Sequence, residues 1–186
     1  MELKDFIEQA LDALQKRYYS AIRGLTAEEL AWQAGPKANP IGFIFWHITR
    51  VEDRLVLVFA QGQTDVWIRD GWYERWGIPA EATGLEYPPE QLARFLLPAL
   101  SEMKAYSETV RHETLTYLRN LESADFEVRP SGTPYPESKA AVAFLQNYTV
   151  GQMFCQFIAE ANQHLGQVAY IRGLQNEYKS ALVRTK

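Results

Sequence analysis

Four long stretches of the chain repeat apolar residues at steps of three and four positions, and this periodicity limits the possible folds more than any other feature. Such spacing places the apolar side chains on one face of a helix. It predicts helices from Leu3 to about Arg23, from Pro40 to near Gly62, from "PPEQL" at 88–92 to about Leu121, and from about 150 to 175. Pro98 lies inside the third stretch and predicts a kink or a break there.

The segments between these stretches contain helix-start signals and prolines. Thr26 with Glu29, and Thr149 with Gln152, have the spacing of capping boxes, which predicts a short helix to about Trp32 and the start of the last helix. The pair Asn39-Pro40 predicts Asn39 as the N-cap and Pro40 as the first residue of the second long helix. "KAAVAFLQNY" (139–148) predicts another short helix.

The fold class predicted from these patterns is all-α: a four-helix bundle with long connections and short extra helices. At 186 residues, of which 47% are hydrophobic and 23% charged, the chain suits one domain over residues 1–186. The net charge is −4 and lysines and arginines do not cluster, so a nucleic-acid partner is not expected. The apolar runs are shorter than the roughly 20 residues of a membrane span, so we expect no membrane association and a cytoplasmic protein.

Two further features need a structural interpretation. Cys155, the single cysteine, rules out an intrachain disulfide and fits a reducing compartment, and its apolar setting "GQMFCQFIAE" predicts an inert thiol in the core. The segment "TDVWIRDGWYERWGIP" (64–79) holds three of the five tryptophans. Its length and aromatic content predict an irregular segment packed over the bundle rather than a flexible linker.

The three histidines differ in their predicted helix faces. His112 is two positions after Val110, so it lies about 200° from the apolar stripe and is assigned to solvent. His47 lies at the edge of the stripe of its helix, and His164 lies inside the stripe of the last helix. Glu160 precedes His164 by one turn, so the two side chains can reach one point.

A glutamate on a buried helix face needs a cation or strong hydrogen bonds. Two imidazoles and one carboxylate suit a divalent metal such as zinc, nickel, iron or manganese, and three protein ligands leave a position for water or substrate. The spacing has a second interpretation, because a pair four residues apart also occurs as a surface pair or as a hydrogen-bonded core histidine.

Two segments carry a resemblance to a known family. "NPIGFIFWHITRVEDRL" (39–55) and "EANQHLGQVAYIRGLQ" (160–175) resemble the signature segments of the DinB-like superfamily, bacterial metal-binding four-helix bundles that include the YfiT-like proteins. The likeness extends over nearly the whole chain in helix order. "VWIRDGWYERWGIP" (66–79) is similar to the segment between helices in one branch of the family.

The resemblance implies a metal site. In the family, one histidine on the second helix and two histidines one turn apart on the last helix bind a divalent metal, most often zinc or nickel. The corresponding positions here are His47, Glu160 and His164, so this chain has glutamate where the family has its middle histidine. Either the carboxylate keeps the site as a third ligand, which we favour, or the site has lost its affinity. Gln167 occupies the glutamine of the family's "HxGQ" pattern and is expected beside the ligands or facing the substrate, with a solvated helix residue as the alternative.

Other residues near these motifs also carry expectations. Gly166 is expected to let a neighbouring helix approach closely. Arg50 and Arg54 follow His47 by one and two turns and could meet an anionic substrate. We expect them instead to pair with acids such as Glu52 and Asp53 on the bundle surface.

Related proteins imply a metal-dependent transferase or isomerase that uses a low-molecular-weight thiol such as bacillithiol or mycothiol. In this interpretation, the metal stabilises the thiolate and the tryptophan-rich segment roofs a pocket for an apolar electrophile. A hydrolase could use the same ion to activate water. The alternative is a stress-related binding or structural bundle without turnover, with a bound or lapsed metal site. The resemblance also implies a homodimer.

Overall fold

The computed structural model describes residues 2–136 and 138–184, and the side chains as far as Asn176. Over these residues the fold is all-α, as predicted, with helices and no strands. Four long helices build it: α1 (Leu3–Ile22), α3 (Ile41–Asp53), α7 (Leu100–Asn120) and α9 (Val150–Arg184). Helix α3 continues directly into a π-helix, η1 (Arg54–Ala60), so the second long stretch is one continuous helix whose last part is π-helical.

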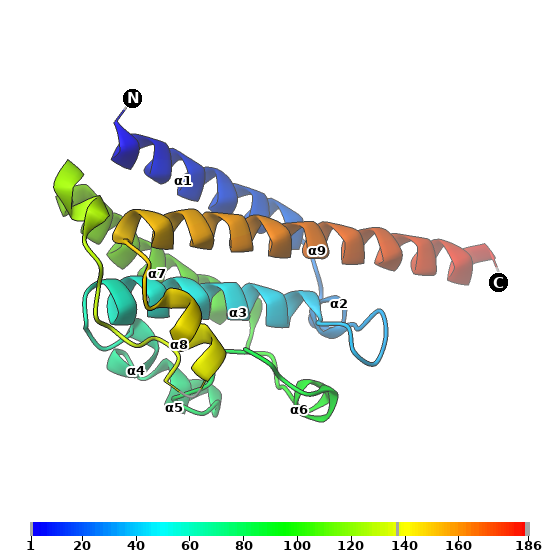
Figure 1. Ribbon diagram of the computed structural model, residues 1–186. Coiled ribbons are helices and arrows are strands. Elements are labelled where there is room, and N and C mark those ends of the chain that lie inside the picture. The colour runs from blue at the N-terminus through cyan, green and yellow to red at the C-terminus, as the bar shows by residue number, and fades with distance from the viewer. Residues whose placement is uncertain (1, 137, 185–186) are drawn as a thin grey trace.

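The four long helices close into a ring around one core. Helix α1 packs on α9, α9 on α3, α3 on α7, and α7 on α1. Figure 1 shows that α1 and α9 run in one direction and that α3 and α7 run in the other. Because α3 and α7 are parallel neighbours, the chain must cross the length of the bundle between them, which explains the long connection at 61–99.

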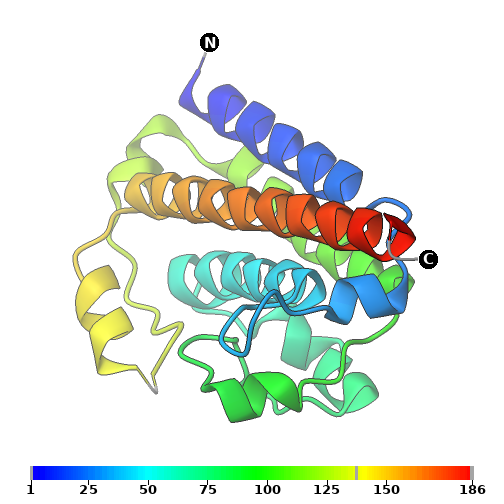
Figure 2. The ribbon, with the colours of Figure 1, turned by 90° about the vertical axis from the view of Figure 1, so that its right-hand side faces the viewer.

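Short helices fill the connections. They are α2 (Ala27–Ala31), α4 (Val66–Arg69), α5 (Trp72–Trp76), α6 (Pro89–Ala93), η2 (Ser123–Glu127) and α8 (Lys139–Leu145). In Figure 2, α8 stands at one side of the bundle and α4 to α6 lie below α3. Both predicted capping boxes are confirmed, because in each pair the two side chains bond reciprocally to the backbone N–H groups.

Three predicted helix boundaries shift. The second long helix begins at Ile41, with Pro40 rather than Asn39 as its N-cap. The third stretch is two helices, because α6 ends at Ala93 and α7 starts only at Leu100. Pro98 has no N–H to donate and its ring would collide with the preceding turn, so the chain breaks before it resumes a helix. The last helix continues through the tail to Arg184, beyond the predicted end near 175.

Helix α3 is buried on every side, although its sequence was interpreted as a helix with one buried stripe. All thirteen of its residues are buried. The other long helices cover one side, and the 61–99 connection covers another. A helix in this position must neutralise its own charges, and the Glu52 carboxylate does so by accepting bonds of 2.7 and 2.9 Å from Arg111 of α7.

The tryptophan-rich segment is more regular than predicted, because it contains α4 and α5. Its three tryptophans pack edge-on and tilted against one another and against Tyr106 of α7, with ring centroids 5.2 to 5.7 Å apart. Trp67 is fully buried. The segment therefore belongs to the core, as an added layer beneath α3 and α7.

Two predictions for α9 are wrong. Cys155 is exposed, not buried, because the neighbouring core positions Met153, Phe154 and Phe157 turn the other faces of the helix inward. Gly166 is exposed, and a Cβ added there would meet no atom of the described residues within 4 Å, so it makes no close helix contact with them. None of the helices among the described residues combines the length and apolar character of a membrane span.

Candidate metal centre

Two packed helices bring the three candidate ligands together. His47 projects from α3, and Glu160 and His164 project from the neighbouring α9, one turn apart. One donor atom from each residue can be chosen so that all three lie within 4.8 Å of one another. The Nε2 atoms of His47 and His164 lie 3.8 and 3.9 Å from the same oxygen of Glu160. His112, by contrast, is exposed on α7, as predicted.

Each imidazole is held through its other nitrogen. The Nδ1 atom of His47 is 2.6 Å from the carbonyl oxygen of Thr83, and Nδ1 of His164 is 3.0 Å from Oε1 of Gln167. An oxygen acceptor requires the proton on Nδ1, so both Nε2 atoms keep their lone pairs for a common partner. This arrangement is typical of histidines that bind a metal.

The Thr83 carbonyl belongs to a segment that is itself fixed. Arg50 donates through Nε to the carbonyl of Ala82, at 3.1 Å. Gly84 has a φ of +82°, and a Cβ at this position would come within 2.9 Å of Nδ1 of His47. The backbone at 82–84 therefore passes so close to the imidazole that only glycine fits at position 84.

Arg50 and Arg54 are not surface residues, which corrects the prediction. Arg50 is fully buried, and its two terminal nitrogens bond to Asp53 and Asp65, each at 3.0 Å. Asp53 also accepts bonds from the backbone N–H groups of Val66 and Trp67. The Arg50 charge is thus fully engaged in holding the 61–99 connection against α3, and it is not available to an anionic substrate.

Burial sets the charge of the three candidate ligands. It lowers the pKa of His47 to about 4, against the opposing hydrogen bond to Thr83, and it lowers the pKa of His164. The same burial raises the pKa of the Glu160 carboxyl. Both imidazoles are therefore neutral near pH 7, the state in which they bind metals. A partly buried carboxylate between them is costly without a cation.

The donor set fits a small divalent ion. Ligand atoms around tetrahedral zinc lie roughly 3.3 Å apart, so separations of 3.8 and 3.9 Å to Glu160 need only small side-chain rotations to close. Two imidazole nitrogens and one carboxylate oxygen are a common catalytic ligand set for such ions. Within the described residues, the cluster holds three such ligands and no fourth.

The tryptophan-rich segment does not roof this site, contrary to expectation. The cavity beside His47 and Glu160 has a volume of about 130 Å³, and its wall is formed by α3, η1, α8, α9 and the loops at Leu85 and Tyr135. The tryptophan rings gather instead around Tyr106, in the layer beneath α3 and α7. A larger hollow of about 450 Å³, between α5 and α6, includes none of the candidate ligands.

Comparison with known proteins bears on the fold and the family. A crystal structure of a conserved protein from Enterococcus faecalis superimposes with a TM-score of 0.76 over 92% of this chain and 96% of that chain. The two sequences are 19% identical, so this likeness shows the shared fold alone. A search of curated proteins finds no match. The sequence model of the DinB superfamily matches residues 10–168, and the chain therefore belongs to the DinB superfamily.

Proposed function

We propose that this chain binds one divalent metal ion, zinc or nickel by preference, through His47, Glu160 and His164. The observation that carries the proposal is the convergence of three donor groups from two packed helices within 4.8 Å. The two neutral imidazoles offer Nε2 lone pairs as ligands. The partly buried Glu160 carboxylate between them offers a third ligand and is stabilised by a cation. Gln167 is assigned a positioning role through its bond to His164.

The proposed reaction is the transfer of a low-molecular-weight thiol to an electrophile. When bound, the ion would stabilise the thiolate and so supply a nucleophile at neutral pH. The sulfur would form a bond to an electrophilic carbon, the leaving group would depart with its electron pair, and the thiol proton would pass to solvent. In an isomerase, the thiol would leave again after the bond rearrangement. A hydrolase would use water in place of the thiol.

The protein residues have defined parts in this scheme. Thr83 and Gln167 keep the Nδ1 protons in place, so the two Nε2 atoms stay directed at one point. Three protein donors leave a coordination position open to the thiol. Glu160 in place of a third imidazole lowers the net charge of the site by one unit, so a divalent ion would leave the site with a net charge of +1.

A non-catalytic bundle is the second candidate, and one observation favours it. Because burial raises the pKa of Glu160, protonation could relieve the cost of the carboxylate without a metal. The homodimer implied by the resemblance stays a prediction, and sedimentation over a dilution series would test it.

Metal content tests the proposal directly. We expect untagged protein, reconstituted with zinc or nickel, to retain about one equivalent by plasma mass spectrometry. His47→Ala and Glu160→Ala should lose it, whereas His112→Ala, which alters an exposed histidine, should retain it. Zinc or nickel at a free concentration of 100 times its Kd should also stabilise the wild type against unfolding by about 2.7 kcal/mol. Wild-type protein without metal after reconstitution would favour the non-catalytic bundle, and metal without thiol turnover would remove only the transferase assignment.

A further inference from the structure

We infer that the cavity beside His47 and Glu160 binds a neutral apolar group of about the size of benzene. This inference rests on the proposed function, because it makes this group one end of a ligand whose other end binds the metal. Its basis is the chemistry of the wall, the size of the cavity and the way in which the wall is fixed.

The wall of the cavity is mainly hydrocarbon. Val51 and Leu55 contribute from α3 and η1, and Leu145 and Phe144 contribute from α8. Leu55 and Leu145 are buried, whereas Phe144 is 53% exposed. Such a surface gains free energy by taking apolar area out of water. A ligand portion bound here would therefore be hydrocarbon or aromatic.

The polar lining does not favour a charged ligand portion. Among the residues that the structure describes, those that line the cavity include no lysine or arginine, and the carboxylate in the lining is the candidate ligand Glu160. The nearby Arg54 does not line the cavity: its Nε donates to the carbonyl of Pro134, and its guanidinium lies 5.7 Å from the centre of the Tyr135 ring. An anionic portion would meet Glu160 without a compensating cation, apart from the metal itself.

The volume limits the size of the group. A dry engineered cavity of about 150 Å³, lined by aliphatic and aromatic side chains, is known to bind benzene. The cavity here, of about 130 Å³, is close to that size. It accepts a six-membered ring or a short branched chain, and it excludes bulky polycyclic groups.

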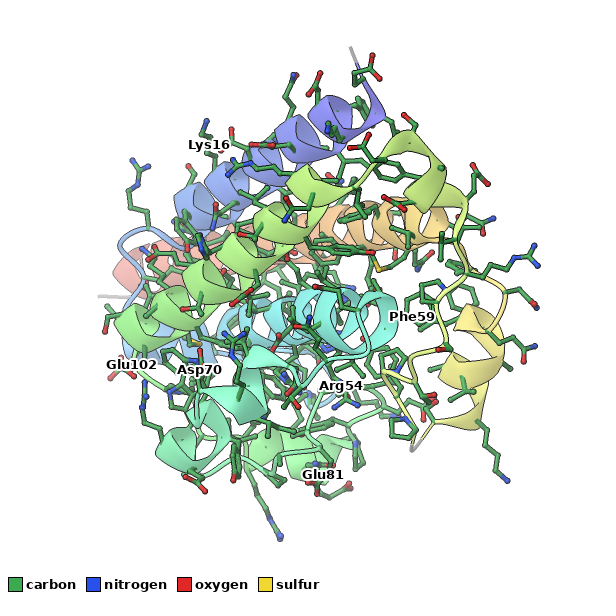
Figure 3. All side chains as sticks on the ribbon, turned by 90° about the vertical axis from the view of Figure 1, so that its left-hand side faces the viewer. Lys16, Arg54, Phe59, Asp70, Glu81 and Glu102 are labelled. Atoms are coloured by element: carbon green, nitrogen blue, oxygen red, sulfur yellow. The ribbon has the colours of Figure 1, made fainter. Side chains whose placement is uncertain are left out.

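One side of the wall, the segment that carries Tyr135, is held by contacts with the π-helix. Gly132 packs so tightly on η1 that a Cβ there would overlap the carbonyl oxygen of Val58. Arg54 holds the same segment through Pro134 and Tyr135. Figure 3 labels Arg54, the first residue of η1, whose side chain bonds to the segment that leads into α8. A wall segment that is already held in place needs little ordering on binding.

A matched pair of variants on α8 tests the inference. Ala141 lines the cavity, whereas Ala143, two residues later, is exposed and does not line it. We expect fluorobenzene to bind metal-free wild type saturably, as followed by fluorine NMR. Ala141→Phe should weaken this binding about tenfold or more, and Ala143→Phe should leave it unchanged. In the same metal-free protein, 4-fluorobenzoate should bind at least about tenfold more weakly.

A second measurement joins the cavity to the metal. In the cobalt-loaded protein, phenylmethanethiol should bind about tenfold more tightly than 2-mercaptoethanol, and Ala141→Phe should abolish the difference. Failure of fluorobenzene to bind, equal binding of 4-fluorobenzoate, or an unchanged affinity in Ala141→Phe would overturn the inference. These results come from metal-free protein, so they are independent of metal content. A protein that binds fluorobenzene but no metal would instead overturn the proposed function.

Discussion

The Nδ1 atom of His47 lies 2.6 Å from the carbonyl oxygen of Thr83, a residue 36 positions further along the chain. This contact selects the tautomer in which Nε2, the nitrogen nearer Glu160, keeps its lone pair free to bind a metal ion. Arg50 holds the same backbone segment in place, because its Nε donates to the preceding carbonyl, that of Ala82. The candidate metal centre thus depends on the connection between α3 and α7 as well as on the two helices that carry the ligands.

Gly84→Ala should weaken metal binding about 10- to 100-fold, because the added Cβ would push on His47, Trp46 and Phe43, at 2.9 to 3.1 Å. Gly62→Ala is the matched control. Gly62 also has a positive φ, of +64°, but its Cβ would meet no atom within 4 Å, so it carries the backbone cost alone. Competition with a chromogenic chelator would measure both affinities. Equal affinities in the two variants would mean that the 82–84 segment does not position the ligand.

The metal-free protein should lose stability as the pH falls below 6.5 because of His47. Its pKa of about 4 in the folded state lies below the unfolded value, so the unfolded chain binds the proton first. The contribution is complete above pH 6.5 and is lost as the pH falls toward 4. Between pH 7.5 and 5 the loss from this residue is about 2 kcal/mol. The raised pKa of Glu160 acts in the opposite direction.

Urea unfolding of protein freed of metal with a chelator, at pH 7.5 and pH 5, measures the contribution of His47 by comparison of the wild type with His47→Gln. The variant should lose about 2 kcal/mol less than the wild type over the same interval, because glutamine does not titrate. An identical pH dependence of the free energy of unfolding in the two proteins would contradict the assigned pKa of His47.

Glu52→Ala should destabilise the fold by about 3–5 kcal/mol, because it leaves the buried Arg111 guanidinium without its carboxylate. Glu8→Ala is the control. Glu8 of α1 pairs on the surface with Arg119, which is on α7 like Arg111, and its loss should cost less than about 1 kcal/mol. The double variant Glu52→Leu with Arg111→Leu should recover part of the loss. Urea unfolding at pH 7 would give all three values. A Glu52→Ala cost as small as that of Glu8→Ala would rule out a structural role for the buried pair.

Cys155 should react stoichiometrically with a thiol reagent in the folded protein, because its side chain is exposed on α9. Cys155→Ser should change neither the free energy of unfolding by more than about 0.5 kcal/mol nor the metal content. Protection of the thiol until urea is added would restore the interpretation as a core residue.

The three candidate ligands show which parts of the site a helical sequence pattern can predict. Glu160 and His164 share a face because they are four residues apart, and this is a local property that their spacing alone determines. The helix face of His47 made it a candidate third ligand, and the resemblance paired it with Glu160 and His164, because spacing on one helix does not specify which neighbour packs against it. The contact between His47 and the Thr83 carbonyl was not predicted, because every residue has a backbone carbonyl and the sequence does not indicate which one will accept a particular hydrogen bond.

The sequence by itself determined the four long helices, most of their ends and the all-α class, because periodicity and capping act within a few residues. The tertiary structure alone decided that α3 is buried on every side, that Arg50 and Arg54 are core residues, and that the tryptophans pack around Tyr106 rather than over the ligands. It also decided that Cys155 faces solvent. The reason is common to these cases. Burial depends on which segments of a long connection return to cover a helix, and that depends on contacts between residues far apart in the chain.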